Sequence, residues 1–236
     1  MSINTYKINE TLKLNKKVII GDPCYKADSM ETVKNVLPGI YHAFLRIADC
    51  NSWGKRISRL MVIHKDYLSK IDYDNSDSYA LENNMSGLYT ENTDYIGVDS
   101  GQAGIYDYAY FRKYENEREY GKPADWYTRV CKMTETPERG GVLDSRCAVS
   151  SSGYGDGSYP CTIFRDKHSK EAVAFSIDFE VEYNADEDDE DEYISCGECI
   201  YCEENEEGIY VCKCPMGTIH YGEEVSFSDG CEHGER

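Results

Sequence analysis

The feature that most constrains how this chain can fold is an unbroken run of seven acidic residues, Asp186 to Glu192. Carboxylates spaced this closely repel one another, so the run favours an extended and solvated segment. The charge is unevenly divided, because residues 184–236 hold 17 acidic and two basic side chains while residues 1–183 hold 27 and 23. The sequence therefore predicts three parts: a main domain (1–183), an acidic linker (184–195) and a cysteine-rich tail (196–236).

The charge and hydropathy of the chain exclude some classes of partner. The formal net charge is −19, and the nearly balanced main domain offers no basic face, so general nucleic-acid binding is not expected. No stretch approaches the roughly 18 consecutive apolar residues of a membrane span, and the N-terminal residues lack the apolar core of a signal peptide. We therefore expect a cytoplasmic protein that does not contact a membrane.

The clearest secondary-structure signal lies at the end of the main domain, between Glu171 and Tyr183. Every second residue from Val173 to Val181 is large and apolar, and the residues between them are small or charged. This period of two predicts a β-strand with one buried and one solvent-facing side. The polar residues 166–169 are the expected turn from a preceding strand, Tyr159–Arg165.

The rest of the main domain indicates short strands with a few helices. Strands are expected at Lys17–Ile20, Gly39–Asp49, Ile57–His64, Tyr95–Asp99, Gly101–Tyr106 and Gly141–Val149, and helices at Asp28–Val36, Asp107–Arg118 and Ala124–Met133. Asp28 and Glu31 have the spacing of a helix capping box, and the polar residues 66–94 indicate loops. The predicted class is α+β: a mainly antiparallel β-sheet or sandwich domain with a few helices, plus a small metal-binding tail.

Six of the 11 cysteines lie in the tail: Cys196, Cys199, Cys202, Cys212, Cys214 and Cys231. Thiolates paired at a spacing of two residues bind a single metal ion well, and four such ligands make a structural zinc site. The spacing favours Cys196 and Cys199 as one pair, with Cys231 and either Cys212 or Cys214 as the other; Cys202 and His233 are alternates. An iron–sulfur cluster uses the same ligand type, and free thiols are the non-metal alternative. We predict zinc.

The other cysteines are scattered through the main domain. In a reducing cytosol they are expected to be small core residues rather than disulfide partners. They are Cys24, Cys50, Cys131, Cys147 and Cys161.

Three segments of the main domain combine glycine, aspartate and tyrosine: residues 21–25, 98–104 and 150–159. Glycine allows the backbone to approach a ligand closely, while aspartate either caps exposed N–H groups or ligates a hard cation. We predict that these loops meet around a ligand, although each alone is also what a well-formed turn requires. The candidate ligand-binding residues are Asp22, Tyr25, Asp99, Ser100, Gln102, Ser152, Tyr154, Asp156 and Tyr159.

Several catalytic patterns are present only in part. Asp99-Ser100-Gly101 resembles the catalytic turn of aspartic proteases, but that chemistry needs a second such aspartate. Residues 153–157 lack the lysine and the following helix of a phosphate-binding loop. No flanking pattern marks Cys24 as a nucleophile. The sequence therefore favours binding over catalysis and assigns no catalytic residue.

The glycine–aspartate segments carry a family resemblance. G-D-P at residues 21–23, V-D-S-G at residues 98–101, S-G-Y-G-D-G-S-Y-P at residues 152–160 and the later I-D-F at residues 177–179 resemble an uncharacterised family of bacterial and phage proteins, a domain of unknown function. The resemblance spans roughly residues 18–180. It implies a bacterial or phage origin and no known activity.

The tail resembles short cysteine-rich segments of phage-encoded proteins. The shared pattern is C-x2-C-x-Y, a spacer with glycine, an aromatic residue and C-K, and a late D-x-C. It implies Cys212 rather than Cys214 as a ligand.

These observations lead to one main functional hypothesis and two alternatives. The main hypothesis is a phage or mobile-element accessory protein that binds a small molecule or a host protein, in the host cytoplasm if phage-encoded, and carries a structural metal tail. The first alternative is a metal-assisted hydrolase that uses Asp22, Asp99 and Asp156. The second is an acidic decoy for a host nucleic-acid-binding protein.

Overall fold

The computed structural model divides the chain into two compact units, Met1–Tyr183 and Asn184–Arg236. In the first unit the structure describes residues 3–74, 87–92, 95–117, 121 and 125–181. In the second it describes short strands at residues 194–195, 202–204, 210–212, 224–225 and 230–231. The acidic run that the sequence predicts as a linker lies outside the described residues.

The first unit contains a larger antiparallel sheet in which six strands lie in the order β1-β4-β5-β13-β12-β6. The strands are β1 (Ile3–Leu14), β4 (Gly39–Asp49), β5 (Lys55–His64), β13 (Ala172–Asp178), β12 (Cys161–Asp166) and β6 (Leu88–Asn92). Within this sheet, β4 and β5 form a hairpin of long strands joined by a short turn, η2 (Asn51–Trp53).

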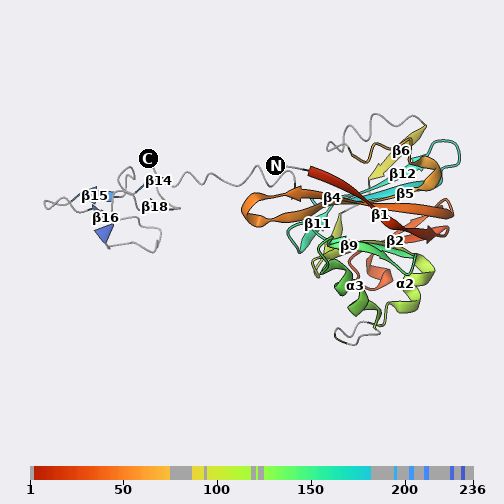
Figure 1. The fold of residues 1–236 in the computed structure, drawn as a ribbon, viewed down its shortest axis with the longest axis horizontal. Coiled ribbons are helices and arrows are strands. Elements are labelled where there is room, and N and C mark those ends of the chain that lie inside the picture. Colours follow the sequence, from red (N-terminus) through yellow and green to blue (C-terminus); the bar gives the residue numbers. More distant parts are fainter. Residues whose placement is uncertain are drawn as a thin grey trace. The chain divides into compact units, whose positions relative to one another are not determined.

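A second antiparallel sheet packs against the first and has the order β3-β2-β8-β10-β9. Its strands are β3 (Glu31–Lys34), β2 (Lys17–Gly21), β8 (Gln102–Asp107), β10 (Cys147–Ser151) and β9 (Gly140–Leu143). A small pair of strands, β7 (Ile96–Val98) and β11 (Gly157–Tyr159), adds a third ladder. Figure 1 shows the two sheets stacked, with the helices below the smaller one.

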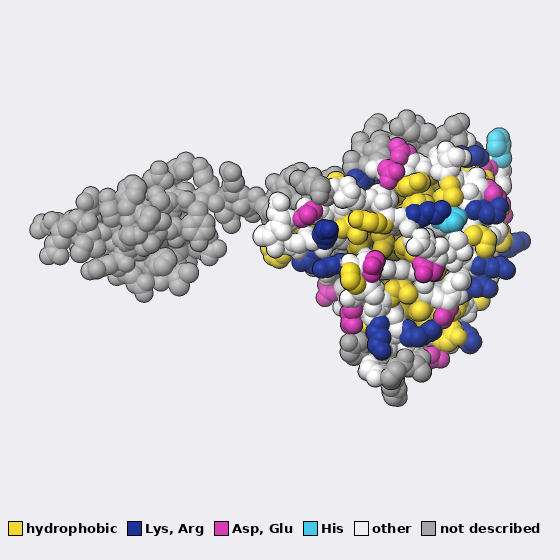
Figure 2. Space-filling view, in the orientation of Figure 1, with side chains coloured by type: hydrophobic (Ala, Val, Ile, Leu, Met, Phe, Trp, Pro, Cys, Tyr) yellow, Lys and Arg dark blue, Asp and Glu magenta, His cyan; other side chains and the backbone are white. Residues whose placement is uncertain are grey.

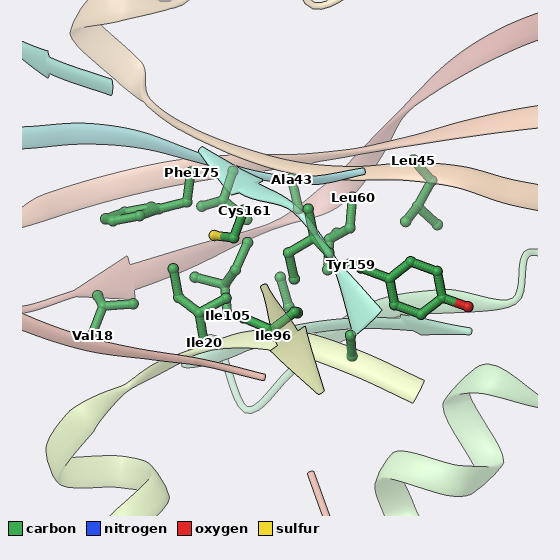
Figure 3. Packing of buried hydrophobic residues seen from close by; sticks show 14 of the residues in the cluster. Val18, Ile20, Ala43, Leu45, Leu60, Ile96, Ile105, Tyr159, Cys161 and Phe175 are labelled. Carbon is green, nitrogen blue, oxygen red and sulfur yellow. The ribbon is translucent and has the colours of Figure 1, made fainter. Parts of the chain in front are cut away.

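The main core lies between the two sheets. Figure 3 shows Val18, Ile20 and Ile105 of the smaller sheet pointing toward side chains of the larger sheet such as Ala43 and Phe175. A fully buried aliphatic or aromatic side chain contributes about 1.5–3 kcal/mol relative to an exposed one. This inter-sheet cluster is therefore the largest source of stability in the unit.

Two further clusters cover the outer faces of the sheets. The helices α2 (Tyr108–Tyr114) and α3 (Trp126–Thr134) pack Phe111 and Trp126 onto the smaller sheet. Asp107 and Asp125 cap these helices by accepting hydrogen bonds from N–H groups of the first turn. Residues around η3 (Lys65–Tyr67) cover part of the larger sheet. Neither helix of the described ranges has the length and apolarity needed to cross a membrane.

The predicted α+β class of the main domain is confirmed, because its described residues form mainly antiparallel sheets with two helices. Gly39–Asp49 is a strand with the bounds that its periodicity predicts, and Tyr41, Ala43 and Leu45 all face the core. The helices expected near residues 107–118 and 124–133 are present in shorter form.

The prediction of a helix at Asp28–Val36 is wrong. That segment holds a short turn, η1 (Ala27–Ser29), followed by strand β3. The β-branched residues Thr32 and Val33 pair with β2, whose edge is open to them, and this pairing outweighs the capping-box signal. Asp28 instead accepts a hydrogen bond from Arg112.

The solvent-facing side predicted for the strand at residues 171–183 is also wrong. β13 lies inside the larger sheet between β5 and β12, and its residues 172–177 are buried on both faces. Phe175 and Ile177 join the inter-sheet core, while Val173 and Ala174 join the cluster on the opposite face. The period of two in the sequence therefore predicted the strand correctly, but it did not predict that the second face of the strand is buried as well.

In the second unit the described backbone forms two small ladders. β14 (Ile194–Ser195) pairs with β18 (Gly230–Cys231), and β16 (Tyr210–Cys212) pairs with both β15 (Cys202–Glu204) and β17 (Glu224–Val225). In the β15–β16 ladder the backbone of Cys202 lies opposite that of Cys212. The other predicted metal ligands, Cys196, Cys199, Cys214 and His233, lie outside the described residues.

Candidate functional site

A buried aspartate joins two of the three glycine–aspartate loops. The side chain of Asp22 is fully buried, and its Oδ2 accepts hydrogen bonds from the N–H groups of Asp99 at 2.8 Å and Ser100 at 2.7 Å. Its Oδ1 accepts from the N–H of Cys24 at 2.6 Å and the Ser100 hydroxyl at 2.7 Å. Four donors satisfy a carboxylate that would otherwise be costly to bury. Asp22 therefore fixes the loop after β2 to the loop after β7.

The third loop attaches to the same place through Gly101. The Gly101 N–H donates to Asp156 Oδ1 at 3.0 Å, and the Gly101 carbonyl accepts from the N–H of Ser152 at 3.0 Å. Gly101 has a φ of 66°, which side-chain-bearing residues rarely adopt. Inside the loop, the hydroxyls of Ser152 and Tyr159 donate to the Gly155 carbonyl at 2.7 and 2.8 Å. We call residues 21–25, 98–101 and 152–157 the loop junction.

Two carboxylates of the junction, those of Asp99 and Asp22, act on Tyr25. Its hydroxyl is hydrogen-bonded to the Asp99 carboxylate, and this bond is the main cause that raises the pKa of Tyr25 above its ordinary value. Partial desolvation and the negative charges of Asp99 and Asp22 raise that pKa further. The phenol is therefore neutral at physiological pH, and its surroundings carry a negative potential.

A small cavity, the junction pocket, opens beside Tyr25 between β2, β3 and β7. Its volume is about 230 Å³, and its lining residues are Ile20, Gly21, Tyr25, Ser29, Met30, Glu31, Tyr95, Ile96 and Gly97. Tyr95 at its edge is 63% exposed. Glu31 is the charged residue among these nine lining residues. The pocket therefore combines a carboxylate with two tyrosine rings.

Helix α3 supports the junction from the side of the smaller sheet. The hydroxyls of Ser100 and Tyr127 are hydrogen-bonded, and burial is the main cause that raises the pKa of Tyr127 to about 12. Gln102 also turns toward α3, since its Nε2 lies 3.5 Å from the Cys131 sulfur and its Oε1 accepts from the Thr134 hydroxyl at 3.1 Å. The helix therefore holds the start of β8 in place.

A comparison with known protein families matches the part of the chain that holds these loops. A family model described as a protein of unknown function (DUF4241) matches residues 14–177. The chain belongs to the DUF4241 family. No curated protein and no solved structure matches the chain.

Membership in an uncharacterised family confirms the resemblance inferred from the sequence, whereas the bacterial or phage origin stays a prediction. The DUF4241 region contains all three loops, the whole smaller sheet and the larger sheet apart from nearly all of β1. The loop junction is therefore part of the family domain rather than an addition to it.

The structure places the predicted ligand-binding residues of the DUF4241 region in three different settings. Asp22, Tyr25, Asp99 and Ser100 lie together, with Ser152 and Asp156 attached through Gly101. Gln102 faces α3, and the buried Tyr159 ring packs edge-on against Phe179 at 5.2 Å. Ligand binding by any of them stays a prediction.

Tyr154 belongs to an aromatic patch that sequence reasoning missed. Its ring lies 6.1 Å from the ring of Trp53, and the Arg56 guanidinium lies 5.7 Å from the Tyr154 ring. Trp53 is 56% exposed and Tyr154 is 38% exposed. The available signal was a tryptophan in a turn sequence, where no core position explains it, but only the fold brings that turn beside residues 152–157.

A second and larger hollow lies between the edge strands β1 and β9. It has a volume of about 720 Å³, and its lining includes Tyr6, Lys7, Ile8, Glu10, Ile47, Asp49, Lys55, Glu138 and Val142. Figure 2 shows hydrophobic side chains between charged ones over the region where Figure 1 places β1, β4 and β9. Acidic and basic side chains both line this groove, so it has no marked preference for one sign of charge.

The geometry weakens the hydrolase alternative. All four hydrogen bonds of the Asp22 carboxylate come from donors of the protein itself, so Asp22 acts as a structural support rather than a ligand for a cation. Within the described residues, no three His, Cys, Asp or Glu side chains are grouped closely enough to hold a metal ion.

Proposed function

We propose that the DUF4241 domain of this chain is a binding module in a phage or mobile-element accessory protein, with the junction pocket as its ligand site. The observation that carries the proposal is the fully buried Asp22 and its four hydrogen bonds. They order two loops beside a pocket before any ligand arrives. Ordering side chains on binding costs about 0.5–1.5 kcal/mol for each one, and a preformed site avoids most of that cost.

The chemistry of the junction favours binding over turnover. The Asp22 carboxylate already accepts hydrogen bonds from the Asp99 N–H and the Ser100 hydroxyl. The Asp99 carboxylate is hydrogen-bonded to Tyr25. A nucleophile or general base must instead reach a substrate atom. The partner is a small molecule or a side chain of a host protein.

The tail is part of the proposal as a structural zinc module. Thiolates at Cys196, Cys199, Cys212 and Cys231 would supply a closed four-ligand site, with Cys202, Cys214 and His233 as alternates and an iron–sulfur cluster as the alternative group. The backbone register supports this, because β18, which ends at Cys231, pairs with β14 immediately before Cys196. Metal content of the purified chain, measured before and after removal of residues 184–236, tests it.

The binding role of the pocket is tested with side-chain-sized probes of each charge type. Nitrogen-15 labelled protein is titrated with n-butylammonium chloride, sodium butyrate and 1-butanol to about 10 mM, where even a millimolar dissociation constant gives near saturation. At least one probe should shift the amide signals of Glu31, Tyr95 and Gly97 and leave that of Glu138 in the β1–β9 groove unchanged. If no probe shifts the pocket signals, the junction pocket is not a ligand site.

A further inference from the structure

We propose that the junction pocket binds a primary ammonium group at the end of an alkyl chain. This inference rests on the proposed binding function and specifies the chemical class of its ligand. The shared chemistry has two sources, a free alkylamine and the lysine side chain of a protein partner.

The charges around the pocket favour a cation. Glu31 forms part of the wall, and the negative charges of Asp99 and Asp22 act on Tyr25, which also lines the pocket. No lysine or arginine belongs to the lining residues given above. A phosphate or carboxylate group would meet like charge from these carboxylates, whereas an ammonium group meets an opposite charge.

The hydrogen-bonding groups of the pocket fit an ammonium donor. Glu31 lines the pocket, and its carboxylate is a hydrogen-bond acceptor; Tyr25 also lines it, with its hydroxyl hydrogen-bonded to Asp99. An ammonium group has three donors and no acceptor. The rings of Tyr25 and Tyr95 add aromatic faces that attract cations.

The size of the pocket separates this ligand from larger ones. A volume of about 230 Å³ is below the roughly 300–1,000 Å³ of sites that enclose drug-sized ligands. A nucleotide is too large as well as negatively charged. A four-carbon chain with an ammonium end fits the pocket in both volume and charge.

Calorimetric titrations compare n-butylammonium with 1-butanol, which has the same chain without the charge, and with butyrate. We expect n-butylammonium to bind about tenfold more tightly than 1-butanol, the factor that about 1.4 kcal/mol of charge-assisted hydrogen bonding gives. Glu31→Gln should weaken n-butylammonium binding by about the same factor. The matched control, Glu138→Gln, removes a carboxylate from the other groove and should leave binding unchanged.

Folding is checked separately by thermal unfolding of each variant. If Glu31→Gln perturbs the fold, Tyr95→Ala replaces it as the test, since this exposed side chain contributes little to the core. A titration with Nα-acetyl-lysine methylamide distinguishes the two sources. Binding tighter than that of n-butylammonium indicates a protein partner, and equal binding indicates a free amine.

Two results would overturn the inference in distinguishable ways. If butyrate or 1-butanol shifts the pocket signals and binds as tightly as n-butylammonium, the ligand class is wrong and the binding module stands. If none of the probes affects Glu31, Tyr95 or Gly97, the proposed function fails as well.

Discussion

Asp22 and Asp156 both follow a glycine in a loop of the junction, yet their settings differ sharply. Asp22 is fully buried and accepts four hydrogen bonds. Asp156 is exposed and accepts one, from the Gly101 N–H. The comparison teaches that the same Gly-Asp dipeptide can be a structural centre or a replaceable surface contact, and that burial decides between them.

The largest expected effect comes from Asp22→Asn. The amide keeps one acceptor and points an N–H₂ group at backbone donors, so buried N–H groups lose their partners. We expect a loss of about 2–4 kcal/mol in the free energy of unfolding, measured by urea denaturation. Asp28→Asn, a matched change at a side chain that is 88% exposed, should cost far less. Similar losses for both variants would show that Asp22 does not hold the junction together.

Ser100→Ala should have an intermediate effect. It removes one hydroxyl donor from Asp22 Oδ1 and leaves the backbone donors in place. The expected loss is about 1–2 kcal/mol, since the hydrogen bonds of the hydroxyl to the Asp22 carboxylate and to Tyr127 are removed without a large cavity. The same urea titration measures it. A loss as large as that of Asp22→Asn would mean that the hydroxyl, not the pair of N–H groups, carries the contact.

Asp156→Asn should change stability by no more than about 0.5 kcal/mol. The side chain is exposed, and the amide oxygen can still accept from the Gly101 N–H. Paired urea titrations with the wild-type protein provide the measurement. A loss above 2 kcal/mol would remove the contrast with Asp22.

The smallest effect concerns Tyr25→Phe and appears at high pH. The pKa of Tyr25 is raised in the folded state by its hydrogen bond to Asp99. Its contribution to stability is therefore complete below the unfolded pKa of about 10 and declines as the pH rises above it. The stability difference between wild type and Tyr25→Phe should be constant at neutral pH and shrink above pH 10. A difference that grows with pH would exclude the Tyr25–Asp99 bond as its source.

Local patterns in the sequence predicted much of the fold. Alternating apolar residues gave the strand Gly39–Asp49, and the predicted strand partner Ile57–His64 lies within β5. The prediction of a helix failed at Asp28–Val36, because residues 31–34 pair with β2 and form a strand. The prediction of a solvent-facing side failed at β13, where the smaller sheet covers one face and the residues around η3 cover the other. In each case the deciding contact comes from residues distant in the sequence.

The candidate site was less accessible to sequence reasoning. Glycine and aspartate marked the loops, but Glu31 and Tyr95 carry no local signal that separates them from surface residues. They become pocket residues only because β3 and β7 lie on either side of the loop after β2. Trp53 joins Tyr154 for the same kind of reason.

The sequence by itself determined the strand-rich character of the main unit and the loops rich in glycine and aspartate. It also determined the concentration of cysteine and negative charge in residues 184–236. These follow from side-chain period, backbone freedom and charge, which are local properties. Only the tertiary structure decided that Asp22 is a buried support while Asp156 is an exposed contact. Burial and hydrogen-bond partners depend on which distant segments meet, and here the partners of Asp22 include residues 77 and 78 positions away along the chain.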